Sequence, residues 1–228
     1  MYDTINMNIP FSEESLHFSQ EYLENQRQII DQDGIVIATL AKIKNLDVSI
    51  NSNRIKIRGS LPRYLYGNNL RMPTLEEVRI ALHSITKTFN VNPEIVKVIE
   101  LHSAINLLTQ KSCRIILDFL GNFRRKQKAN FPNGIGYLTE RNYLLVYDKE
   151  KKMKKEKMLS PELKNEFGKN ILRIERRWKK LGMNNSLLGK QIYLTHLMEE
   201  TFFKSIFSET ITSFLNIEKK SIFGNAKY

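Results

Sequence analysis

The chain has 228 residues, 41% of them hydrophobic and 26% charged, so it is long and apolar enough to bury a core. Its single cysteine, Cys113, excludes an internal disulfide framework and a cysteine-cluster zinc site. The formal net charge is +12, the first residues lack the pattern of a secretory signal, and no apolar run reaches the roughly 18 residues of a membrane span. We therefore expect a reduced, soluble, cytoplasmic protein with no membrane partner.

The first half of the chain is predicted to be rich in strands, with one clear helix. Short, partly alternating segments predict strands at residues 35–40, 46–50 and 54–58. Asn51-Ser52-Asn53 is typical of a turn, so the last two strands are predicted to form a hairpin. Thr74-Leu75-Glu76-Glu77 has the spacing of a capping box and predicts a helix from about Leu75 to Thr88. Residues 95–102 then predict another strand.

The second half alternates helices and strands. A helix is predicted at 110–120, ended by Gly121, and a hairpin or one bent strand is predicted over 134–140 and 142–149. A second helix is predicted to begin at Ser160-Pro161-Glu162. A strand at 170–176 and a helical region at 186–215 are predicted to follow. Several neighbouring strands are predicted to run antiparallel. The fold class is therefore α+β, with a central, mainly antiparallel sheet, helices packed on it and a C-terminal helical segment.

The positive charge is concentrated in one quarter of the chain. Residues 124–180 hold 18 lysines and arginines against 7 acidic residues, a net charge of +11. The two densest clusters are 124–128 and 149–157. Clustered cations neutralise phosphates and release counterions, which favours a nucleic-acid partner. The alternative is a solvated charged loop, and an anionic membrane is less favoured because no amphipathic apolar face adjoins the cluster.

Common nucleotide and hydrolase motifs are absent from the sequence. It contains no phosphate-binding Gly-x-x-x-x-Gly-Lys-Ser/Thr loop, no Gly-x-Gly-x-x-Gly fingerprint, no Gly-x-Ser-x-Gly elbow and no His-Glu-x-x-His pair. The sequence therefore argues against an ATPase of the P-loop class, a dinucleotide enzyme, an α/β-hydrolase and a zinc protease.

One pair of residues could bind a divalent cation. Glu100 and His102 are two apart on a predicted strand, so their side chains point to the same face and could hold Mg²⁺ or Mn²⁺. Glu175, on another predicted strand, would be a third ligand if the two strands are neighbours. The alternative is that Glu100 pairs with a nearby lysine or arginine while His102 is a hydrogen-bonded edge residue.

Two further segments could contact phosphate or bases. Tyr147 and Lys149 end a predicted strand on one face, where the ammonium could lower the pKa of the phenol or bind a phosphate. The predicted loop at 59–70 is rich in Tyr, Asn and Arg, which stack on bases, read their edges and grip phosphate. The alternatives are a strand-end aromatic beside a solvated lysine, and a turn with its tyrosines packed inward.

Several segments, in this order, carry a resemblance to a known family. They are Met1-Tyr2-Asp3-Thr4 to Ile9-Pro10, Gly59-Ser60-Leu61-Pro62 through Tyr66-Gly67-Asn68, Val98-Ile99-Glu100, Leu145-Val146-Tyr147-Asp148-Lys149 and Leu172-Arg173-Ile174-Glu175. Together they resemble the replication-initiation proteins of filamentous phages and related plasmids, the gene II/gene X family. The resemblance implies an HUH-endonuclease, Rep-like fold, with a DNA nicking and binding domain at 1–180 and a helical extension at 181–228.

The resemblance also implies an activity and its site. The expected activity is rolling-circle initiation, in which a tyrosine and a divalent metal nick one strand of origin DNA and leave a 5′-phosphotyrosine and a 3′-OH primer. Glu100, His102 and Glu175 would be ligands of Mg²⁺ or Mn²⁺, and Lys149 a phosphate contact. The nucleophile would be Tyr147 or Tyr193, of which Tyr193 lies in the predicted helical region.

The expected partners are single-stranded or supercoiled origin DNA and the host helicase and polymerase, in a bacterial cytoplasm. The expected DNA contacts are Arg63, Tyr64, Tyr66, Asn68, Arg124, Arg125, Arg173 and Arg176. Many family members are longer than this chain, so we expect the chain to be either a short member of the family or a truncated copy. The alternative function is a non-catalytic DNA-binding protein of the same family.

Overall fold

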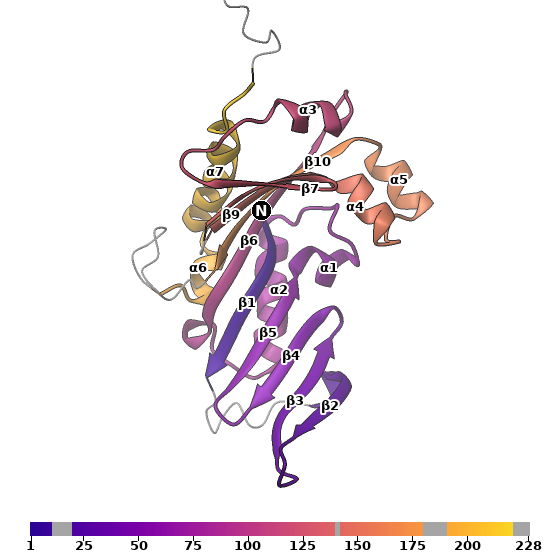
Figure 1. Cartoon of the computed structure of the whole chain (residues 1–228). Helices are drawn as coiled ribbons and strands as arrows, with labels where there is room; N and C mark the ends of the chain where they lie inside the picture. Colours follow the sequence, from indigo (N-terminus) through magenta and orange to yellow (C-terminus); the bar gives the residue numbers. More distant parts are fainter. Residues whose placement is uncertain (11–19, 140–141, 180–190, 221–228) are drawn as a thin grey trace, which may run out of the picture. The chain divides into compact units, whose positions relative to one another are not determined.

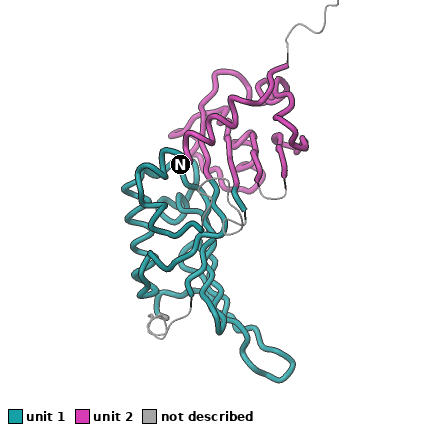
Figure 2. The backbone as a smooth tube through the Cα atoms, turned by 90° about the vertical axis from the view of Figure 1, so that its left-hand side faces the viewer, with its two compact units in different colours: residues 1–102, 178–205 teal, residues 103–177, 206–228 magenta. Residues whose placement is uncertain are grey.

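The structure is a computed structural model that describes residues 1–10, 20–139, 142–179 and 191–220 (Figure 1). The fold is α+β, with a large antiparallel sheet and helices, as predicted. The chain divides into two compact units, with unit 1 formed by residues 1–102 and 178–205 and unit 2 by residues 103–177 and 206–228 (Figure 2). The predicted domain boundary at residues 180–181 lies outside the described residues.

The strands are β1 (Tyr2–Pro10), β2 (Glu24–Ile30), β3 (Val36–Ile43), β4 (Leu46–Asn51), β5 (Arg54–Ser60), β6 (Lys97–Leu108), β7 (Gln127–Phe131), β8 (Gly134–Leu138), β9 (Asn142–Asp148) and β10 (Ile171–Lys179). The α-helices are α1 (Leu61–Tyr66), α2 (Leu75–Thr88), α3 (Cys113–Phe119), α4 (Lys149–Lys155), α5 (Pro161–Phe167), α6 (Leu194–Met198) and α7 (Glu200–Leu215). Short 3-10 turns are η2 (Gln20–Tyr22) and η3 (Pro93–Ile95). None of the helices in this described part of the chain combines the length and the apolar character needed to cross a membrane.

In unit 1 the strand order is β2-β3-β4-β5-β1, followed by the first half of β6. The pairs β1–β5, β2–β3, β3–β4 and β4–β5 are all antiparallel. Alternate residues of β1, including Ile5, Met7 and Ile9, are fully buried, and so are Val78, Leu82 and Ile85 on one side of α2. Helix α1 packs on β1 and against α2.

Two predictions for unit 1, the helix that begins after Thr74 and the hairpin at residues 51–53, are confirmed, because residues close together in the sequence determine both. Helix α2 has the predicted bounds, because Thr74 Oγ1 accepts from Glu77 N (3.2 Å) while Glu77 Oε2 accepts from Thr74 N (2.8 Å). The β4–β5 hairpin also forms at the predicted turn. The fourth predicted strand, at 95–102, begins only at Lys97, because η3 occupies Pro93–Ile95 after its cap at Asn92.

The prediction of a loop over 59–70 was wrong in part, because residues 61–66 form α1. Ser60 is its N-cap and accepts from Arg63 N, and Pro62 is compatible with the first turn. Gly67 ends the helix in the left-handed conformation (φ 72°), which glycine adopts without strain. These three residues are the start and stop signals of a helix that is only six residues long.

Unit 2 contains the second half of β6 and then, in strand order, β10, β9, β8 and β7. Strands β7, β8 and β9 form an antiparallel meander. One face of the meander supplies Ile135, Tyr137, Leu144 and Val146 to a buried cluster with α3, which packs on β8 and β9. The described parts of 134–140 and 142–149 therefore form a hairpin and not one bent strand.

The last helical region and the lysine-rich segment both differ in detail from prediction. Residues 186–190 lie outside the described part, and the remainder is interrupted at Glu199, which separates α6 from α7. The lysine-rich segment is not a solvated loop, because α4 begins directly at Lys149. Asp148 caps this helix by accepting from Lys151 N (2.9 Å), and Met153 is buried beneath it.

Unit 1 ends in an exposed apolar hairpin. All seven residues of β2 are exposed, and the side chains of Ile30, Ile35 and Val36 are 57%, 61% and 47% exposed. Figure 2 shows this hairpin projecting from the rest of the unit. The pairing of β2 with β3 contains two register shifts, so its backbone is irregular.

Candidate metal and DNA site

Glu100 and His102 lie side by side on β6, as the spacing predicted, and both are buried. His102 Nε2 is 2.9 Å from Glu100 Oε1, and Arg58 approaches Glu100 Oε2 at 3.6 Å. The hydrogen bond from His102, supported by the charges of His102 and Arg58, lowers the pKa of Glu100 to about 2. Because an ionised carboxylate only accepts, Nε2 carries the proton, and in the neutral ring the metal-binding lone pair is on Nδ1. The local arginine pairing that was the alternative for Glu100 is therefore present.

Asp3 on β1 is the residue that the sequence reasoning did not single out. It is buried, and its Oδ1 accepts from Ser60 Oγ at 3.3 Å. Within unit 1 the ligand atoms of Asp3 and His102 lie within 4.8 Å of one another. Asp3 and His102 are two buried side chains of unit 1 that could bind a metal ion, and Glu175 is a buried carboxylate of unit 2. The only signal for Asp3 was its place in the first of the resembling segments, since β1 and β6 are almost a hundred residues apart.

In unit 2 the carboxylate of Glu175 on β10 is surrounded by donors. Tyr147 Oη on β9 donates to Glu175 Oε2 at 2.8 Å, and Arg177 Nε donates to Oε1 at 2.7 Å. The Nε of Arg173 is 3.6 Å from Oε2. Glu175 is thus a buried carboxylate whose two oxygens already have partners: Arg173 and Arg177 are cations and Tyr147 is a phenol.

Lys149 does not share a strand face with Tyr147, because β9 ends at Asp148 and Lys149 is the first residue of α4. Its side chain is nevertheless buried. The change from strand to helix at this point follows from the Asp148 cap, which the strand-based prediction did not include.

Tyr193 lies at the N-cap of α6 and is half-buried. Its backbone forms an antiparallel bridge with Lys97 of β6, and its ring stacks on His196. Lys97 precedes His102 by five residues, which is about 16 Å along an extended strand. The backbone of Tyr193 is therefore displaced from His102 by about this length along β6.

The residues predicted to contact DNA at 63–68 make hydrogen bonds and packing contacts within unit 1. Tyr64 is buried, hydrogen bonds with Ser84 (3.1 Å) and has Lys44 over its ring. Burial and a hydrogen bond with Glu77 raise the pKa of Tyr66 to about 12. The side chain of Asn68 accepts from Leu70 N at 3.0 Å, and Arg63 is half-buried. This is the arrangement of the inward-packed alternative.

The four predicted arginine contacts divide into two kinds. Arg124 and Arg125 are exposed. Arg173 is 0% exposed and donates to Asn106 (3.0 Å), and Arg176 is buried and donates to Ser213 of α7 at 2.9 Å. Burial argues against a DNA contact for Arg173 and Arg176, whose guanidinium groups instead connect strands and α7 within unit 2.

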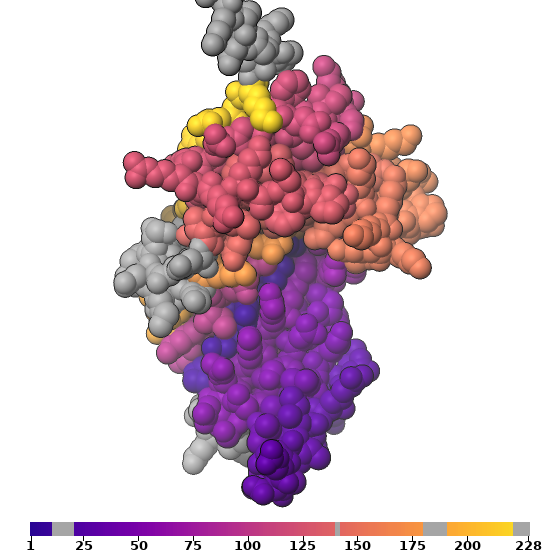
Figure 3. Space-filling model, viewed as in Figure 1, coloured from indigo at the N-terminus to yellow at the C-terminus, as the bar shows by residue number. Residues whose placement is uncertain are grey.

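Unit 2 carries almost all of the net charge, with 21 lysines and arginines against 10 acidic residues. The helices α4 and α5, drawn in orange, are part of its surface (Figure 3). A polar pocket of about 340 Å³ collects four of the cations, namely Arg114, Lys128, Lys151 and Lys220.

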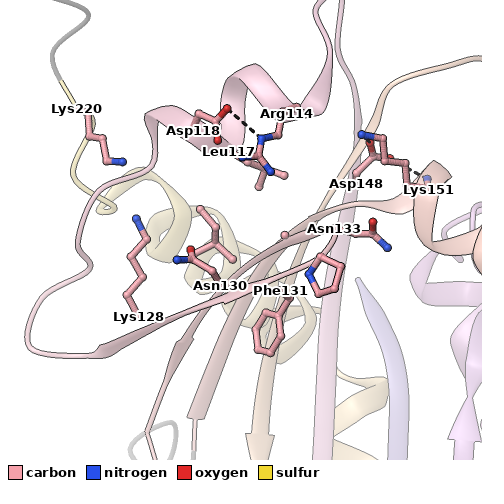
Figure 4. A pocket seen from close by; sticks show the side chains of 13 residues that line it. Arg114, Leu117, Asp118, Lys128, Asn130, Phe131, Asn133, Asp148, Lys151 and Lys220 are labelled. Atoms are coloured by element: carbon pink, nitrogen blue, oxygen red, sulfur yellow. Dashed lines mark hydrogen bonds and ion pairs between the residues drawn. The ribbon is translucent and has the colours of Figure 1, made fainter.

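The cations of this pocket are partly neutralised. Arg114 pairs with Asp118 (3.0 Å), and Lys151 lies 3.8 Å from Asp148 (Figure 4). Figure 4 shows Lys128 and Lys220 on the other side of the pocket from these pairs. Burial, assisted by the charge of Lys220, lowers the pKa of Lys128. The pocket is therefore suited to contact an anion at its Lys128–Lys220 side.

A comparison with models of known protein families found no match. A comparison with curated protein sequences also found none.

Proposed function

We propose that this protein is a metal-dependent nickase that cuts one strand of origin DNA and initiates rolling-circle replication. The observation that carries the proposal is the hydrogen bond of 2.8 Å from the Tyr147 hydroxyl to the buried carboxylate of Glu175. A phenol beside a metal-binding carboxylate is the arrangement that a tyrosine nucleophile for a phosphodiester needs.

The proposed ligands fit a divalent cation. Asp3 and His102 of unit 1 offer a carboxylate oxygen and an imidazole nitrogen, and Glu175 of unit 2 offers carboxylate oxygens; ligands of these kinds suit Mn²⁺ and, with water, Mg²⁺. The bound cation would neutralise charge on the non-bridging oxygens of the scissile phosphate. Glu100 would act as the outer carboxylate that orients the imidazole of His102.

The proposed reaction uses Tyr147 as the nucleophile in preference to Tyr193. The Tyr147 oxygen forms a bond to phosphorus, and the bond from phosphorus to the 3′ oxygen breaks. The phenol proton passes to Glu175, which already accepts it in a hydrogen bond. The departing 3′ oxygen takes a proton from water and becomes the 3′-hydroxyl, and the hydroxide that remains takes the proton from Glu175. The 5′ phosphate stays on the tyrosine.

A second candidate is a non-catalytic DNA-binding protein. The observation in its favour is that Arg177 and Arg173 already compensate the charge of Glu175, which weakens the attraction of this carboxylate for a cation. Both candidates use the basic surface of unit 2 and bind DNA in a salt-dependent manner.

The first test is nicking of a supercoiled plasmid that carries the DNA beside this gene, with Mn²⁺, Mg²⁺ or EDTA. We expect a metal-dependent open circle and a protein–DNA adduct on a denaturing gel for the native chain and for Tyr193→Phe. Tyr147→Phe should give neither. An adduct in Tyr147→Phe would exclude this nucleophile, and binding without a nick under either metal would leave the non-catalytic candidate.

The second test measures the metal directly. A ligand that binds only the folded state raises the melting temperature. Mn²⁺ should therefore raise the melting temperature of the native chain and of the control Glu24→Gln, an exposed residue of β2. Asp3→Asn should lose this response. An equal response in Asp3→Asn would remove Asp3 from the metal site.

A further inference from the structure

The meander of unit 2 has a second apolar face that the core does not use. Because side chains alternate along a strand, Leu144 and Val146 of β9 point into the buried cluster, and Tyr143, Leu145 and Tyr147 point the other way. These three residues line a cavity of about 600 Å³, which is within the usual range for small-ligand sites. A solvent-facing strand face would ordinarily be polar, so this one is suited to an apolar or aromatic ligand.

Gly136 of β8 leaves open the space beside two cavity-lining side chains, Phe131 and Leu145. Gly134 and Gly136 lie opposite Tyr147 and Leu145 in the register of the sheet. A Cβ atom on Gly136 would lie 2.7 Å from Cε2 of Phe131 and 3.0 Å from Cδ2 of Leu145. A side chain at this position would therefore occupy the space between the Phe131 ring and Leu145.

The rim of the cavity is cationic. Lys152, Lys155 and Arg177 line it, and the one acidic residue beside them is Glu156. Lys152 Nζ lies 4.9 Å from the centroid of the Tyr147 ring. Arg177 uses Nε for Glu175, and among the described residues its two Nη groups make no hydrogen bond. An aromatic floor with a cationic rim matches a base attached to a phosphate.

We infer that this cavity accepts one unstacked base of single-stranded DNA. The inference rests on the proposed function, because the same Tyr147 that lines the cavity holds its hydroxyl on Glu175. A base stacked against Phe131 and Tyr143 would place its phosphate at the rim, near Lys155 and Arg177. The base would thereby fix the register of the strand relative to Tyr147, and a paired base in a duplex would be excluded.

The experiment separates the base from the phosphates. Anisotropy measures the affinity of the full chain for a short labelled oligothymidylate and for an abasic strand of the same length, both in EDTA so that no cleavage occurs. The native chain should prefer the strand with bases about tenfold, because stacking of one base on aromatic side chains has this size. Phe131→Ala should lose this preference, and because Phe131 is 48% exposed, its loss should leave the fold intact.

Gly136→Val fills the cavity and should also lose the preference while it binds the abasic strand like the native chain. The control is Ala38→Val, a similar enlargement on strand β3 of unit 1, which is not among the residues that line the cavity. If both Phe131→Ala and Gly136→Val retain the tenfold preference, the inference is wrong. This experiment measures binding alone, so a protein that fails to nick DNA would not contradict the inference about the base. In the same way, absence of a base preference would not contradict the proposed roles of the metal and the tyrosine, which the nicking assay tests.

Discussion

The buried pair of Glu100 and His102 predicts a specific dependence of stability on pH. At neutral pH Glu100 is ionised, and its pKa of about 2 is far below that of an unfolded glutamate. A lowering of this size corresponds to about 3 kcal/mol if all of it enters the free energy of unfolding. Because Arg58 is about half exposed and water screens its charge, we expect Glu100→Gln to cost about 2 kcal/mol at pH 7.

The sign of the pH dependence follows from the direction of the shift. A carboxylate with a lowered pKa in the folded state stabilises the protein above its unfolded pKa, and it loses this contribution as the pH falls through the folded pKa. The difference in unfolding free energy between the native chain and Glu100→Gln should therefore be constant near pH 7 and roughly half as large at pH 3.

Urea denaturation at a series of pH values measures this difference. The single tryptophan, Trp178, is buried and reports unfolding by its fluorescence. Glu24→Gln, on the exposed strand β2, is the matched control and should change neither the stability nor its slope with pH. An undiminished effect of Glu100→Gln at pH 3 would refute the reasoning, since the pair would then contribute through packing and not through the charge of the carboxylate.

Three other changes test other parts of the structure. Replacing Arg124 and Arg125 together by alanine should weaken DNA binding and reduce the slope of log K against log salt by about 2, as anisotropy at several salt concentrations would measure; an unchanged slope would mean that these arginines do not touch phosphate. Arg176→Met should lower the free energy of unfolding by roughly 2 kcal/mol in urea, because buried Ser213 loses a donor. Thr74→Ala should cost about 1 kcal/mol by removing the cap of α2, and no loss would show that Glu77 alone closes this end.

Short-range chemistry explains which parts of the fold could be predicted. The bounds of α2 follow from Thr74 and Glu77, three residues apart, and the shared face of Glu100 and His102 follows from the period of a strand. Helix α1 was predicted as part of a loop at 59–70 because the start and stop signals of the helix are only a few residues apart. A helix this short does not show a periodic pattern of apolar residues.

The candidate site was less predictable because its residues come from separate strands. Asp3 has no neighbour in the sequence that marks it as a ligand, and only the pairing of β1 with its neighbours in the sheet brings it near His102. The burial of Arg176 depends on Ser213, more than thirty residues later on α7. Long-range packing of this kind leaves no local pattern, so a basic residue in a basic segment is easily mistaken for a surface contact.

The exposed hairpin of unit 1 bears on how the protein behaves at high concentration. Strand β2 is the last in the strand order, so its outer backbone groups have no strand partner among the described residues, and Ile30 and Ile35 face water beside it. Such an edge is a template for a strand from another molecule, although the two register shifts and the charge of Arg27 oppose a regular match. We expect concentrated samples to associate through this hairpin first, so that a lysine in place of Ile35 would raise solubility while the chemistry of β6 and β10 stays the same.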